Sequence, residues 1–68
     1  MSKELPFIIF CVEEYKNQKH LSGKDVISLF NKYAVTDYIR SFYEVLHTNG
    51  TRYLVNDIDL YIKSRATA

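Results

Sequence analysis

The sequence predicts an all-α fold, a compact single-domain bundle of four short helices. Three observations indicate this class. Apolar residues recur at spacings of three and four, residues typical of helix N-caps precede several of these stretches, and the 68 residues include only two glycines and one proline. The links between stretches are short enough that we expect neighbouring helices in one bundle. We predict one domain over residues 1–68, with an ordered core over about residues 5–65.

The first predicted helix covers residues 5–19. Pro6 suits the first turn of a helix, where its missing N–H costs nothing. The six residues 7–12 are apolar on every face, which is typical of a helix buried on all sides. A strand is the alternative for such a run, but the polar residues that follow and the length of the pattern favour a helix. The residues at helical spacing are Leu5, Ile8, Val12 and Tyr15.

Two further helices are predicted over residues 23–33 and 36–47. Ser22 is a good N-cap for the first, with Asp25 in its first turn, and Thr36 followed by Asp37 begins the second. The sequence Thr48-Asn49-Gly50 ends the second, because Asn or Gly takes the left-handed conformation that caps helix ends. The residues predicted to face inward are Val26, Ile27, Phe30 and Tyr33, then Tyr38, Ile39, Phe42, Tyr43 and Leu46.

The last predicted helix covers residues 57–65. Asn56 is its expected N-cap, with acids in the first turn and bases in the last, as the helix dipole prefers. Ile58, Tyr61 and Ile62 form its buried stripe. The preceding residues 51–55 are β-branched and aromatic, a composition that also suits a short extended segment.

Composition and charge argue against several classes of protein. An apolar fraction of 47% argues against disorder, and the longest apolar run is six residues against about 20 for a membrane span. The formal net charge is +1 with dispersed basic residues, so nucleic acid is an unlikely partner on electrostatic grounds. One cysteine and no export signal fit a reducing compartment, and we expect a cytoplasmic protein.

The sequence carries no pattern that indicates catalysis, a metal or a cofactor. Cys11 lies inside the apolar run and is predicted to be a small core residue rather than a nucleophile. His47 falls in the last turn of a helix, where the dipole favours its charged form. Asp57 and Asp59 are two residues apart and do not face each other on a helix, so capping explains them. We therefore predict a protein that is not an enzyme and has no small-molecule substrate.

The apolar run on the first helix predicts a contact with another protein. We expect that three short helices do not cover it on all sides, and an uncovered apolar patch marks a partner surface. Phe7, Phe10 and Cys11 are our candidates for self-association or for a contact with a different protein. The alternative functions are a structural homo-oligomer and a small helix-turn-helix-like DNA-binding regulator. In the second, Arg40 is the one basic residue near the start of the helix that would read DNA, and Asp37 opposes such contacts.

Three stretches of the chain resemble a family of very short bacterial proteins that is known as a domain of unknown function. They are residues 7–15, residues 21–33 and, above all, residues 43–50, which contain a Tyr-x-x-Leu-His-Thr-x-Gly signature. The resemblance covers about residues 6–64 and brings no catalytic residues with it. Its signature falls here on Tyr43, Leu46, His47, Thr48 and Gly50, which we interpret as a helix end and its cap.

Members of that family are often encoded beside a gene that resembles an ADP-ribosyltransferase toxin. The resemblance therefore implies an antitoxin-like or accessory role, in which the chain would mask the cleft of the toxin. For this contact we select aromatic and charged residues around the predicted turn, namely Tyr43, His47, Arg52 and Tyr53. The sequence-based hypothesis is a non-enzymatic protein-interaction module whose partner is a toxin encoded nearby or a second copy of the chain.

Overall fold

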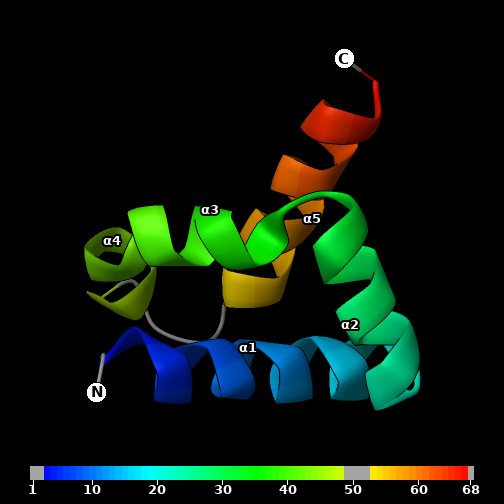
Figure 1. The fold of residues 1–68 in the computed structure, drawn as a ribbon, viewed down its shortest axis with the longest axis horizontal. Helices are drawn as coiled ribbons and strands as arrows, with labels where there is room; N and C mark the ends of the chain where they lie inside the picture. Colours follow the sequence, from blue (N-terminus) through cyan, green and yellow to red (C-terminus); the bar gives the residue numbers. More distant parts are fainter. Residues whose placement is uncertain (1–2, 49–52, 68) are drawn as a thin grey trace.

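The computed structural model describes residues 3–48 and 53–67, and within them the regular secondary structure is helical, as predicted (Figure 1). The helices are α1 (Glu4–Lys19), α2 (Gly23–Lys32), α3 (Val35–Ser41), α4 (Tyr43–Thr48) and α5 (Leu54–Ala66). α1 packs against α2, α3 and α5, and α2 stands at the C-terminal end of α1 (Figure 1). α4 lies near the other end, beside the start of the chain (Figure 1).

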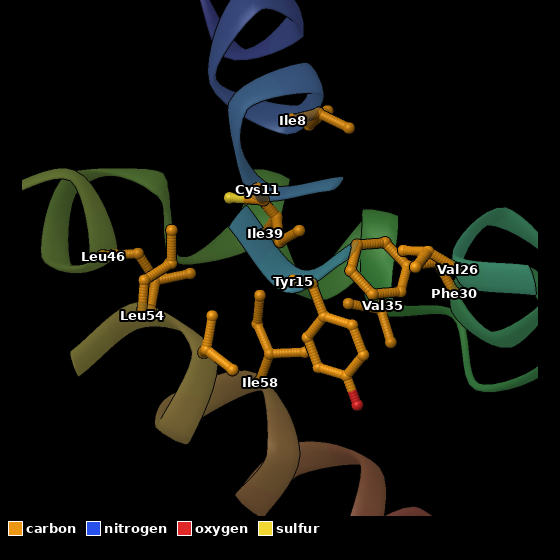
Figure 2. Packing of buried hydrophobic residues seen from close by; sticks show 11 residues of the cluster. Ile8, Cys11, Tyr15, Val26, Phe30, Val35, Ile39, Leu46, Leu54 and Ile58 are labelled. Atoms are coloured by element: carbon orange, nitrogen blue, oxygen red, sulfur yellow. The ribbon is translucent and has the colours of Figure 1, made fainter. Parts of the chain in front are cut away.

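One hydrophobic core joins the five helices, as Figure 2 shows. The buried side chains come from every helix: Ile8, Cys11 and Tyr15, then Val26 and Phe30, Val35 and Ile39, Leu46, and finally Leu54, Val55 and Ile58. The radius of gyration is 11.2 Å, close to the roughly 11 Å that a compact domain of this length has. The chain is therefore a single small all-α domain.

The first two helices have the predicted bounds to within a residue at most ends. Ser22 caps α2, because its hydroxyl oxygen accepts a hydrogen bond from the backbone N–H of Asp25 at 3.1 Å. α1 ends where His20 adopts a left-handed conformation with φ 56°, and the backbone N–H of this residue bonds to the Lys16 carbonyl oxygen. Local capping interactions thus set the end of α1 and the start of α2.

The helix predicted over residues 36–47 is instead two helices, α3 and α4. The break lies at Phe42, whose φ of −113° is not helical. The helices stay closely joined, because the Phe42 N–H bonds to the Tyr38 carbonyl at 3.0 Å and the Leu46 N–H bonds to the Phe42 carbonyl at 2.9 Å. Thr36 is not the N-cap of α3, since that position belongs to Ala34, which is left-handed with φ 55°.

The start of the last helix also differs from the prediction. α5 begins at Leu54, so an extended segment over residues 53–55 is wrong, and the N-cap position belongs to Tyr53 rather than Asn56. Leu54 and Val55 are both buried in the core, and this burial outweighs the strand preference of their neighbourhood. Residues 49–52, which include the predicted stop at Asn49 and Gly50 and the rest of that segment, lie outside the described residues.

Helical spacing predicted the core correctly at several positions and wrongly at others. Val26, Phe30, Ile39, Leu46 and Ile58 are buried as expected. In contrast, Leu5, Ile27 and Phe42 are exposed, and α1 is not covered on all sides because Ile9 is 57% exposed. Phe42 lies at the break between α3 and α4 and on no helical face, and the packing of the helices leaves Leu5, Ile9 and Ile27 exposed.

Candidate functional site

Four of the aromatic side chains that we predicted as partner contacts lie together on one surface. They come from two separate parts of the chain. Phe7 and Phe10 belong to α1, and Tyr43 and His47 belong to α4. We call these four residues the aromatic surface. The Phe7 ring lies 6.3 Å from Phe10, 5.4 Å edge-on from Tyr43 and 6.2 Å edge-on from His47, measured between ring centroids. Tyr43 and His47 stack on each other at 4.9 Å.

The spacing of residues on each helix explains how these rings come together. Phe7 and Phe10 are three residues apart, and Tyr43 and His47 are four apart, so each pair shares one side of its helix. Phe10 and His47 are exposed, whereas Phe7 and Tyr43 are half-buried. The ring contacts tie α4 to α1, and they also leave aromatic area facing outward, as a partner surface requires.

An ion pair lies at the border of the aromatic surface. The Lys3 ammonium donates a hydrogen bond to Glu44 Oε1 at 3.2 Å and lies 5.4 Å from the centroid of the Tyr43 ring. The hydrogen bond to Glu44 and the negative charge of its carboxylate raise the pKa of Lys3. Both side chains are largely exposed, 67% for Lys3 and 75% for Glu44, so water screens the pair.

The remaining predicted contact residues are Cys11, Arg52 and Tyr53. Cys11 points into the core and is fully buried. The prediction that it contacts a partner is therefore wrong. The other prediction, that it is a small core residue, is confirmed. Burial raises the pKa of the Cys11 thiol to about 12, which makes it a poor nucleophile. Tyr53 is exposed immediately before α5, and Arg52 lies outside the described residues.

Sequence reasoning missed an aliphatic groove on the other flank of α1. The groove has a volume of about 360 Å³ and lies between α1, α2 and the start of α3. Ile9 and Ile27 form its exposed rims, and Ile27 is 53% exposed although its spacing predicted an inward side chain. We call it the aliphatic groove: Ile8, Ile9, Val12, Ile27 and Phe30, with Glu13, Asn31 and Thr36 at its polar margin. The available signal was the run of apolar residues on every face of α1.

A polar cluster joins α1 to α5 on a third side. The Tyr15 hydroxyl donates a hydrogen bond to Asp59 Oδ1 at 2.7 Å, and Lys19 pairs with the other oxygen of the same carboxylate. The Tyr15 ring is buried while its hydroxyl points out of the core (Figure 2). Burial, with the Asp59 hydrogen bond as the second cause, raises the pKa of Tyr15. Asp59 therefore links two helices and does not serve as the helix-end residue that its position suggested.

The described residues contain no group of three or more His, Cys, Asp or Glu side chains able to hold a metal ion. In the same part of the chain, no helix combines the length and the apolar character needed to cross a membrane. Asp37 and Arg40 of α3 are both exposed. A helix-turn-helix role for α2 and α3 stays a prediction, which a band-shift assay at low and high salt would test because phosphate contacts weaken steeply with salt.

Comparison with known proteins identifies a family but no characterised relative. The model of the family described as "Protein of unknown function (DUF3791)" matches residues 6–65. This range agrees with the resemblance seen over about residues 6–64 of the sequence. No curated protein and no solved structure matches the chain.

Proposed function

We propose that this chain, which belongs to the DUF3791 family of proteins of unknown function, is a non-enzymatic protein-interaction module. It binds a partner protein through the aromatic surface of α1 and α4. The observation that carries this proposal is the meeting of two segments, residues 7–10 and 43–47, that sequence reasoning selected on separate grounds. Tyr and other aromatic side chains are enriched among the residues that dominate binding energy at protein interfaces.

The size of the chain is compatible with such a role. A typical stable interface covers about 800 Å² on each partner. The accessible surface of the chain is 4678 Å², so a contact of that size would occupy about a sixth of it. α1 also offers exposed apolar area at Leu5, at Phe10 of the aromatic surface and at Ile9 of the aliphatic groove.

For the identity of the partner, the family resemblance favours a toxin. Members that resemble this chain are often encoded beside an ADP-ribosyltransferase-like gene, and the signature residues Tyr43 and His47 belong to the aromatic surface. We propose that the chain covers the cleft of such an enzyme in the cytoplasm and thereby blocks access of its substrates. The one cysteine of the chain is free and buried, as suits a reducing compartment.

The decisive experiment compares two substitutions of exposed apolar residues. Phe10→Asp places a charge on the aromatic surface, whereas Leu60→Asp places the same charge on α5, where Leu60 is 59% exposed and belongs to neither candidate surface. Partners captured from the native host are identified by mass spectrometry, purified and titrated by calorimetry. We expect Phe10→Asp to weaken binding by about tenfold or more and Leu60→Asp by less than about twofold.

Circular dichroism of both variants shows whether they keep the native fold, so that a loss of binding is not a loss of folding. Equal affinity of the two variants for the captured partner would rule out the aromatic surface. The toxin hypothesis has its own readout, inhibition of the neighbouring ADP-ribosyltransferase-like enzyme in an NAD cleavage assay. Absence of inhibition by the wild-type chain at equimolar concentration would exclude an antitoxin role.

A further inference from the structure

Tyr43 of the aromatic surface and the adjoining Glu44 are the two elements of a receptor for a cationic side chain. The Tyr43 ring presents a π-face, and Glu44, the next residue on α4, presents a carboxylate. An ammonium already occupies this position, because Lys3 contacts both groups at once: its Nζ lies 5.4 Å from the ring centroid and 3.2 Å from Glu44 Oε1. A ring face together with an anion is the combination that proteins use to hold ammonium and guanidinium groups.

We propose that Tyr43 and Glu44 bind an arginine side chain of the partner protein, and that Lys3 occupies this site in the free chain. The inference rests on the proposed function and states which chemistry the partner brings to the aromatic surface. Arginine suits the site better than lysine, because a planar guanidinium stacks on an aromatic ring and makes two parallel hydrogen bonds to one carboxylate. Phe7 contacts the Tyr43 ring edge-on and His47 stacks on it, and both contacts hold the ring in place.

The contacts of Lys3 are well suited to displacement. Lys3 precedes the first turn of α1 and is 67% exposed, and Glu44 is 75% exposed, so the pair gains little from burial. The Lys3 side chain forms its hydrogen bond with Glu44 and its ring contact with Tyr43, both on α4. A partner arginine would therefore replace Lys3 without disturbing the core, and Lys3 acts as an internal competitor for the site.

The first test uses small probes on the full chain. N-acetyl-arginine amide and N-acetyl-citrulline amide have nearly the same shape, but the neutral ureido group of citrulline lacks the charge and the paired donors of the guanidinium. Both are titrated while the Tyr43 ring and the α4 amides are followed by NMR. We expect the arginine probe to shift these signals and the citrulline probe to leave them unchanged. Lys3→Met should tighten arginine binding by about twofold to fivefold, as the loss of an exposed ion pair predicts. Glu44→Gln should weaken it by about fivefold or more, because it removes the charge of the carboxylate and one of its two acceptors.

Lys16→Met is the matched control, because Lys16 pairs with Glu13 at 3.5 Å, away from the aromatic surface. It should leave arginine binding unchanged. Equal shifts by the arginine and citrulline probes, or identical affinity of the wild-type and Lys3→Met chains, would overturn the proposal. A test with the captured partner separates the arginine site from the proposed function. If Phe10→Asp weakens binding of the partner and Glu44→Gln does not, the aromatic surface is the interaction surface but the arginine site is refuted.

Discussion

The buried thiol of Cys11 makes the stability of this protein sensitive to alkaline pH. Cys11 is fully buried in the core, and burial raises its pKa from 9.0 to about 12. When folding raises the pKa of a group, the group contributes its full stabilisation of the folded state at pH values below the pKa that it has in the unfolded chain. Between pH 9 and about pH 12 the unfolded chain releases the thiol proton while the folded chain retains it. The free energy of unfolding must therefore fall as the pH rises through this range.

The size of the loss follows from the shift in pKa. Each pH unit between the two pKa values lowers the free energy of unfolding by about 1.4 kcal/mol, so the loss is about 2 kcal/mol at pH 10.5 and about 4 kcal/mol at its limit. Domains of this length have a total stability of roughly 3–10 kcal/mol. Ionisation of Cys11 alone thus removes a large part of the stability. Tyr15 adds to the loss above its ordinary pKa of 10.0, because its folded pKa is also raised.

Urea unfolding followed by circular dichroism at pH 8.0, 9.0, 10.0 and 10.5 measures this loss. The matched variant is Cys11→Ala, which cannot ionise and starts about 1 kcal/mol less stable because it leaves a small cavity. Between pH 8.0 and 10.5 we expect wild type to lose about 2 kcal/mol more than the variant. Tyrosine ionisation contributes equally to both proteins and cancels in the comparison.

Equal losses in the two proteins would refute the reasoning. A second readout is the reaction of the thiol with a disulfide reagent at pH 8. Folded protein should react far more slowly than urea-unfolded protein, because the thiolate is the reactive form and the thiol is inaccessible. Rapid labelling of the folded chain would show that Cys11 is not the buried core residue described here.

Four further substitutions test the structure, all by urea unfolding. Ala34→Gly should stabilise the protein by about 1 kcal/mol, because Ala34 holds the left-handed conformation with φ 55° that glycine adopts without strain; destabilisation would contradict that backbone. Tyr15→Phe should cost about 1–2 kcal/mol through loss of the hydroxyl hydrogen bond to Asp59, and no change would show that this bond contributes nothing. Ile58→Ala should lower the free energy of unfolding by about 2–5 kcal/mol because the side chain is fully buried. Ile27→Ala should lower it by less than about 0.5 kcal/mol because Ile27 is exposed, and a loss as large as that of Ile58→Ala would contradict this exposure.

Local chemistry explains which parts of the fold were predictable from sequence. Ser22 bonds to the Asp25 N–H three residues away, so its role as a cap depends on neighbouring residues alone. The apolar spacing that placed Val26 and Phe30 in the core is likewise a property of one helix. The all-α class and the bounds of α1 and α2 followed from such signals.

The break at Phe42 and the start of α5 were not predictable in this way. Neither glycine nor proline marks the break, and the ring contacts of Tyr43 with Phe7 arise between residues 36 positions apart. Leu54 and Val55 have the composition of an extended segment, yet their burial against distant helices makes them helical.

For the candidate site, the amino-acid sequence alone predicted that the first helix carries more apolar surface than the three other predicted helices cover. It also placed aromatic residues near the end of the third predicted helix. Only the tertiary structure decided that Phe7, Phe10, Tyr43 and His47 share one surface, and that Cys11 lies in the core instead. The physical reason is that helical periodicity specifies the direction of each side chain relative to its own helix axis. Which of those directions meets a neighbouring helix and which meets solvent depends on how the helices pack.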